Sequence, residues 1–187
     1  MILGLDISTS ITGATILDKD NQIVYNTAWD TRKYKNIFEK ATYVKEQILD
    51  LYNKHGLDHH SHTSDTIEHI FIEQPFTFFN SGGSSAKTMA ALQKFNGIVS
   101  WMVYELFEIK PQYVGATQAR KLCGIKVPRG QKAKKVVLQH LLDTEKAFSV
   151  EYTRFGNPKP ESFDRADAII VARAGHKIIQ DLLDSEE

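Results

Sequence analysis

The chain of 187 residues lacks both a second cysteine and any long apolar run. Its one cysteine, Cys123, excludes an intramolecular disulfide and a cysteine-based zinc site, and we expect it to be a small packing residue. No apolar stretch approaches the ~20 residues that a membrane span requires. The first residues also lack the basic and apolar regions of a secretory signal. These absences predict a soluble, cytoplasmic protein with no membrane partner.

Acidic residues are missing from one long segment, residues 110 to 135. The formal net charge of the chain is +0, which by itself argues against a polyanionic partner. An acid-free basic segment is nevertheless an electrostatic signature of phosphate binding. The alternative is a solvated surface whose counter-charges come from distant parts of the chain. The basic residues of this segment are Lys110, Arg120, Lys121, Lys126, Arg129, Lys132, Lys134 and Lys135.

The sequence is rich in apolar residues, and 42% of its residues are hydrophobic. That is enough for one sizeable core, and we expect a single domain over residues 1–187. Segments 2–7, 12–18 and 22–29 resemble strands separated by a Ser/Thr bend and the turn sequence DKDN, which predicts an antiparallel meander. Apolar residues spaced three and four apart predict an amphipathic helix over 34–54.

In the second part of the chain, predicted strands alternate with predicted helices. Three strands followed by alternating strands and helices predict an α/β fold: a mixed five-stranded sheet, antiparallel then parallel, flanked by helices. The first strand is expected at the centre, beside the strand that ends in Glu73. The remaining predicted elements are strands at 70–73 and 112–116, and helices at 86–108, 117–124, 131–143 and 163–183.

Four carboxylates fall where such a fold would bring them together. Asp6 lies near the end of the first strand and Glu73 ends the fourth, so both should emerge at the carboxyl edge of the sheet. Asp164 and Asp167, spaced i and i+3, should share one face of the last helix at its first turn. Each has an ordinary alternative, such as helix capping for Asp164 or a solvent-facing strand end for Glu73. Together, at the rim of one core, they would repel one another unless a cation joined them.

The chemistry of this set predicts a hard metal ion. Oxygen-only ligands select Mg²⁺, for which Mn²⁺ can substitute, and two such ions about 3.5 to 4 Å apart can promote phosphodiester hydrolysis. The histidines within residues 59–62 are a competing candidate, but they lack helical spacing and are interpreted as an exposed loop. The hydroxyl-rich segment GLDISTS suggests a further alternative, an ATP-binding hairpin like that of actin-like proteins and sugar kinases. Those proteins need a second core and a late glycine-rich motif, which this chain lacks.

Three segments, GLDIS, IEQPF and DRADAIIVA, resemble motifs of the RuvC-type Holliday junction resolvases of the RNase H-like superfamily. The resemblance extends over nearly the whole chain. It implies that Asp6, Glu73, Asp164 and Asp167 bind Mg²⁺, with about two ions in each site. The family usually has Pro-Gly after the first aspartate, where this chain has Ile7 and Ser8. The insert around residues 57–69 is also longer than typical, as in divergent or phage-borne members.

The resemblance also implies how DNA would be bound and cut. A homodimer would nick two strands of a four-way junction or other branched DNA, leaving 5′-phosphates. We expect the dimer contact on the predicted helix 86–108, and nothing in the sequence identifies a helicase partner. A protein that binds junctions without cutting them is a second alternative. The implied catalytic lysine is Lys134, and the resemblance implies DNA contacts by Phe76, Arg120, Lys121 and Lys134. The acid-free basic segment adds Arg129, Lys132 and Lys135 as expected DNA-binding residues.

Overall fold

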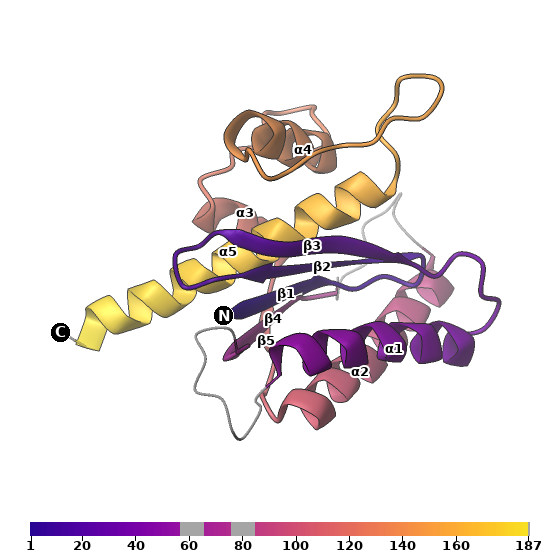
Figure 1. Ribbon diagram of the computed structural model, residues 1–187. Helices are drawn as coiled ribbons and strands as arrows, with labels where there is room; N and C mark the ends of the chain where they lie inside the picture. The colour runs from indigo at the N-terminus through magenta and orange to yellow at the C-terminus, as the bar shows by residue number, and fades with distance from the viewer. Residues whose placement is uncertain (57–65, 76–84, 187) are drawn as a thin grey trace.

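The computed structural model describes residues 1–56, 66–75 and 85–186, in which five strands form one mixed sheet with helices on both faces (Figure 1). The sheet order is β3-β2-β1-β4-β5. The strands are β1 (Ile2–Asp6), β2 (Ile11–Leu17), β3 (Ile23–Asp30), β4 (His69–Glu73) and β5 (Gln112–Val114). The helices are α1 (Ile37–His55), α2 (Ala86–Phe107), α3 (Ala116–Leu122), α4 (Ala133–Thr144) and α5 (Glu161–Glu186).

The strand pairing confirms the predicted fold class. β1, β2 and β3 pair antiparallel, whereas β4 pairs parallel to both β1 and β5. β1 therefore lies at the centre of the sheet beside β4, as the sequence predicts. No helix in the described ranges is long and apolar enough to cross a membrane.

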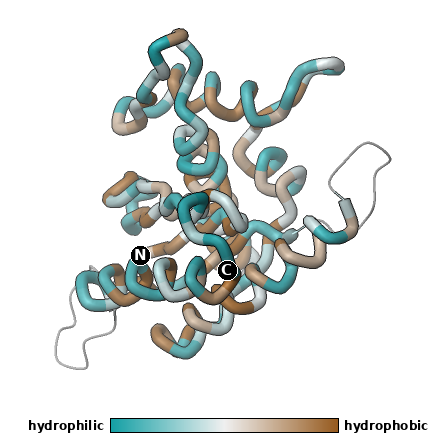
Figure 2. Tube along the Cα trace, turned by 90° about the vertical axis from the view of Figure 1, so that its right-hand side faces the viewer, coloured by the Kyte–Doolittle hydropathy of each residue, from teal (hydrophilic) through white to brown (hydrophobic). Residues whose placement is uncertain are grey.

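The two faces of the sheet bury different side chains because neighbouring residues of a strand point to opposite sides. Leu3 and Leu5 of β1 join one core with α1 and α2, whereas Ile2 and Phe71 join a second core under α5. α3 and α4 pack against α5. Figure 2 shows hydrophobic and hydrophilic positions alternating along the helical coils, as expected of helices with one side against a core.

α5 lies unusually close to the sheet, and glycines permit this. A Cβ atom at Gly4 would lie 2.6 Å from the Ala172 Cβ, and one at Gly13 would lie 2.6 Å from the Asp164 carbonyl carbon. Contacts below about 3 Å are not tolerated in packed interiors, so each added methyl would displace the helix. Glycine is therefore required at these two places by the proximity of α5.

α2 buries most of the stripe that its apolar spacing predicts, and further residues beside it. The predicted stripe is Met89, Leu92, Phe95, Ile98 or Val99, Met102 and Leu106. Phe95 and Val99 are buried, and Ile98, Met102 and Leu106 are partly buried against the same core. The other buried residues are Asn96, Ser100, Val103 and Phe107. Apolar residues occur almost all round this helix, so their spacing alone did not include Val103 and Phe107. Trp101 and Tyr104 remain exposed.

α5 begins two residues earlier than predicted, at Glu161, directly after Pro160. Asp164 therefore lies in the first turn of the helix, as expected, whereas Asp167 lies in the second turn. The two remain on one face of the helix, because residues three apart in a helix are neighbours.

Candidate metal centre

Asp6 and Glu73 lie side by side where β1 and β4 end. Gly4 pairs with Phe71 in the parallel register, so the next residues on that face of the two strands are Asp6 and Glu73. This is the face that α5 covers. The structure thus brings together the two strand-end carboxylates that the sequence singled out.

The N-terminal turns of α5 bring the other two carboxylates to the same place. Gly13 is the cross-strand partner of Asp6, and it lies directly beneath the backbone of Asp164. The side chains of Asp164 and Asp167 are only 12% and 16% exposed. The sequence analysis missed Gly13, whose role depends on a contact between distant segments. All four predicted carboxylates consequently lie in one cluster.

Lys134, from the first turn of α4, completes this cluster. Its Nζ lies 3.7 Å from Asp164 Oδ1 and 3.4 Å from Asp167 Oδ2, while its side chain remains 61% exposed. The ammonium group therefore faces both the carboxylates and solvent. Lys134 belongs to the basic segment 110–135, and its counter-charges, Asp164 and Asp167, come from a distant part of the chain.

The electrostatics of the cluster are those of acids held close together in a poorly solvated place. Burial, and then repulsion by Glu73 and Asp167, raise the pKa of Asp6 well above its usual value. Burial and the negative charge of Asp167 raise the pKa of Glu73 to about 7. Burial raises the pKa of Asp164 to about 6, and it also raises that of Asp167, although Lys134 opposes both shifts.

The pKa of Lys134 responds in the complementary direction. Burial acts to lower it, but the attraction of Asp167, Asp164 and Asp6 outweighs burial and raises the pKa. A lysine stabilised in its charged form by three acids shows that the cluster favours a cation.

Two polar residues of α2 support the cluster from the opposite face of the sheet. Asn96 Nδ2 donates a hydrogen bond of 3.4 Å to the Glu73 carbonyl oxygen, and Ser100 Oγ donates one of 3.3 Å to Asn96 Oδ1. Both residues are buried. The sequence analysis missed them because polar residues within an apolar helix carry no signal of what they contact.

In the hydroxyl-rich bend after Asp6, the Ser8 hydroxyl forms hydrogen bonds within the bend itself. Ser8 Oγ accepts a hydrogen bond of 3.0 Å from the Ile11 amide and donates one of 2.7 Å to its carbonyl oxygen. Lys40 Nζ and Thr31 Oγ1 both donate to the carbonyl oxygen of Thr9. These hydroxyl and carbonyl groups hold the strand end that carries Asp6.

The donor set suits a hard divalent cation. Four carboxylates with raised pKa values offer oxygen ligands and an excess of negative charge, which Mg²⁺ and Mn²⁺ neutralise best. Across residues 1–56, 66–75 and 85–186, no three His, Cys, Asp or Glu side chains are already spaced to hold one ion. Instead, the Lys134 ammonium lies against two of the acids. Metal binding would therefore require the carboxylates to rotate toward one another.

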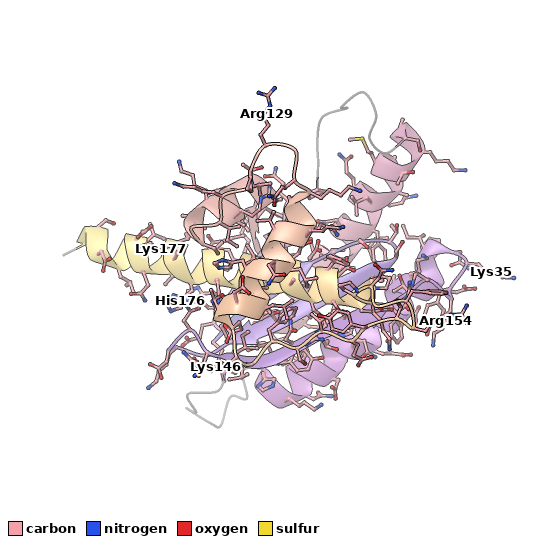
Figure 3. The ribbon with its side chains drawn as sticks, turned by 90° about the horizontal axis from the view of Figure 1, so that it is seen from above. Lys35, Arg129, Lys146, Arg154, His176 and Lys177 are labelled. Atoms are coloured by element: carbon pink, nitrogen blue, oxygen red, sulfur yellow. The ribbon has the colours of Figure 1, made fainter. Side chains whose placement is uncertain are left out.

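The other predicted DNA-binding residues fall into two groups. The positive charge of Arg120 opposes the rise in the pKa values of Glu73 and Asp167, so its guanidinium lies close to the cluster. Arg120 and Lys121 also line a pocket of about 330 Å³ together with Lys126. The second group, Arg129, Lys132 and Lys135, is exposed and forms no ion pair with any described residue. Arg129 projects away from the body of the molecule (Figure 3).

Two sequence predictions lie outside the described residues. Phe76 belongs to the segment 76–84, and the histidines of 59–62 belong to the segment 57–65.

The strand order, with its central parallel pair and its covering helices, defines the class of the protein as an RNase H-like fold. Within that class, the chain is similar to Thermus thermophilus RuvC in complex with a Holliday junction substrate, with a TM-score of 0.62 and 14% identity. This match covers 96% of the present chain and 94% of the other. A second structure of Thermus thermophilus RuvC matches with a TM-score of 0.56 and 14% identity, covering 96% and 95%. At this identity the likeness shows the fold.

Comparisons at the level of sequence found no relative. No protein-family profile matches the chain, and no curated protein matches it.

Proposed function

We propose that this protein is a metal-dependent, structure-selective DNA endonuclease. It would resolve Holliday junctions or other branched DNA by paired nicks that leave 5′-phosphate ends. The observation that carries the proposal is the convergence of Asp6, Glu73, Asp164 and Asp167 beside Lys134. An acidic cluster of this kind opposes folding unless it serves a cation. The RuvC-like fold over 96% of the chain supports the choice of branched DNA as substrate.

The residues of the cluster would have two roles, metal binding and contact with the DNA phosphate. Asp6, Glu73, Asp164 and Asp167 would hold one or two Mg²⁺ ions. Bound Mg²⁺ supplies positive charge that polarises a phosphate and lowers the pKa of a water molecule. Lys134, held at the mouth of the cluster, would contact a phosphate oxygen of the strand to be cut.

The basic residues would position the DNA backbone. Arg120, whose charge acts on the cluster, lines one pocket together with Lys121, and a phosphate group there would be held by charge. Arg129, Lys132 and Lys135 carry charges that no described acid neutralises, so they are free to bind further phosphates. Binding should then weaken steeply with salt, as counterion release requires.

Paired nicks require two active sites, and a homodimer would provide them. The exposed side of α2 has two large aromatic residues, Trp101 and Tyr104, whose rings lie 5.8 Å apart. Exposed aromatic side chains of this kind are enriched at interfaces between proteins. We therefore assign the dimer contact to α2, as the sequence analysis also proposed.

The proposal is tested by incubating the purified protein with a labelled four-way junction and with linear duplex of the same sequence. Mg²⁺-dependent nicks in the junction, absent in EDTA, are the expected result. Sealing of the product by DNA ligase would identify the 5′-phosphate. A protein that binds the junction and never cuts it with either Mg²⁺ or Mn²⁺ would be a binding protein, and the enzyme proposal would be wrong.

Glu73→Gln separates chemistry from binding. It removes a proposed ligand without changing size, so nicking should be lost while the affinity for the junction remains. Glu68→Gln is a matched control, because Glu68 is an exposed carboxylate just before β4 that pairs with the terminal amine of Met1. Normal nicking by Glu73→Gln would show that the assigned site is wrong.

A further inference from the structure

A β-hairpin, residues 151–159, projects from the molecule between α4 and α5 (Figure 1). The Thr153 amide donates a hydrogen bond of 2.7 Å to the Asn157 carbonyl oxygen, and the Gly156 amide donates one of 2.9 Å to the Thr153 carbonyl oxygen. Gly156 has a φ of 74°, which a glycine adopts without strain. These bonds fix the conformation of the turn, so the residues at its tip are presented in one orientation.

The tip carries Arg154 and Phe155. The Phe155 side chain is 75% exposed, and the Arg154 guanidinium lies over its ring, 4.6 Å from the centroid. Arg154 forms no ion pair with any residue in the described ranges. A single exposed apolar side chain is common. An exposed ring combined with an unneutralised guanidinium is the pairing that stacks on nucleobases and binds the adjoining backbone.

The hairpin lies at the end of the molecule that holds the carboxylate cluster. It leads through Pro160 into α5, whose first turn carries Asp164. Figure 3 shows Arg154 on the same side of the molecule as Lys35, near the start of α5. The segment before α1 is fastened to this region, because Arg32 pairs with Glu161. A nucleic acid that reached the cluster would thus pass basic residues on this side too.

We infer that the tip of the hairpin is a second DNA-contacting element, in which Phe155 stacks on a base exposed at a branch point and Arg154 binds a neighbouring phosphate. The inference rests on the proposed function for its class of partner, branched DNA. The Phe155 contact would also explain why branched DNA is bound in preference to linear duplex. A continuous duplex offers the ring no free base face, whereas a junction does.

The test measures binding of the full-length protein in EDTA, so that no strand is cut. The probes are a four-way junction with 2-aminopurine beside the branch point and a linear duplex with the same label. The wild-type protein should change the 2-aminopurine signal in the junction. Phe155→Ala should abolish that change and weaken junction binding about tenfold, because one stacked base is lost. Its affinity for linear duplex should change by less than about twofold.

Leu182→Ala is the matched control, since Leu182 is also an exposed apolar side chain, on the distal part of α5. It should leave both affinities and the signal unchanged. Junction binding by Phe155→Ala that equals the wild type, or equal losses on both DNAs, would overturn the inference. A changed sedimentation coefficient with unchanged DNA binding would also overturn it, because the tip would then contact a second copy of the chain.

The two proposals can fail separately. If the wild type nicks junctions with Mg²⁺ and Phe155→Ala behaves identically, the hairpin inference is wrong and the nuclease stands. If junction binding depends on Phe155 but nothing is cut, the hairpin inference stands and the nuclease is wrong.

Discussion

The two faces of the sheet are built on different principles. On the α1 and α2 face, large aliphatic side chains such as Val44, Ile48 and Val99 fill the space between sheet and helices. On the α5 face, glycines let helix backbone rest on strand backbone, as at Gly4 and Gly13. The first arrangement adapts to small changes of side-chain volume, whereas the second does not.

The carboxylates lie on the α5 face of the sheet, which does not adapt to changes of side-chain volume. Asp6 and Glu73 project toward α5, and Asp164 is positioned by the contact of α5 with Gly13. A metal site requires ligands held to within a fraction of an ångström. Direct backbone contact fixes the backbone that carries Asp164, so that only side-chain rotation is needed to bring the ligands together. The predictions that follow test this difference between the faces.

Gly13→Ala should have the largest effect. The added methyl would push the Asp164 backbone outward, and a displacement of about 1 Å can reduce a reaction rate about 100-fold. We expect nicking to fall by at least that much, with a loss of about 1–3 kcal/mol in the free energy of unfolding. Nicking rates and urea unfolding measure the two effects. Gly115→Ala, at a glycine with no atom within 4 Å of the added methyl, should retain nicking. Equal rates for Gly13→Ala and wild type would contradict the proposed role of the contact.

The pH dependence of stability should be the next largest effect. The pKa of Glu73 is raised from 4.5 to about 7, so the folded protein binds more protons than the unfolded chain between these values. The free energy of unfolding without metal should therefore decrease by about 3 kcal/mol from this group as the pH rises through this range. Saturating Mg²⁺ should reduce the decrease, since it neutralises the ionised cluster. Urea unfolding at several pH values, with and without Mg²⁺, measures it. An increase in stability over the same range would contradict the assignment, and Glu73→Gln should make the decrease smaller, because Asp6, Asp164 and Asp167 remain.

Lys134→Ala should have an intermediate effect. It removes a charge beside Asp164 and Asp167, and with it the proposed phosphate contact. We expect nicking to slow about tenfold and the slope of log K against log salt to decrease by about one. Lys177→Ala is the control, because Lys177 is paired with Asp181 on α5, away from Arg154 in Figure 3. An unchanged salt slope for Lys134→Ala would mean that this lysine serves the carboxylates alone.

Ile48→Val, on the opposite face, should have the smallest effect on function. Ile48 is fully buried against the sheet, and removing one methylene there costs about 0.5–1.5 kcal/mol. Nicking and Mg²⁺ dependence should not change. Thermal unfolding and a nicking assay under saturating Mg²⁺ test both statements. A loss of nicking comparable to that of Gly13→Ala would mean that the two faces do not differ in the way described.

Much of the fold followed from the sequence because it is encoded locally. Short apolar runs, spaced apolar positions and turn residues predicted the ten elements of the described residues and the central place of β1. The four carboxylates followed from their positions at the ends of apolar runs. Gly13, Asn96 and Ser100 were missed because each acts through a tertiary contact, and no local pattern records such a contact.

The hairpin tip was missed for a different reason. The sequence signal for phosphate binding is basic charge without acid, and the hairpin contains an acid, Glu151. In the structure Glu151 pairs with Lys159 at the base of the hairpin, 2.5 Å apart, and leaves Arg154 free at the tip. Counting charges along a chain does not distinguish a neutralised pair from an isolated residue beside it.

The contact between α5 and β2 also limits how this chain can vary in length. Loops before Pro160 can gain or lose residues without changing α5, because they end before the helix begins. One residue inserted between Asp164 and Asp167 would rotate the two side chains relative to each other by about 100° around the helix axis. Only one of them could then face β1. Relatives that keep this site should therefore preserve the spacing of these two aspartates, and relatives that keep the hairpin contact should also preserve the residues at its tip.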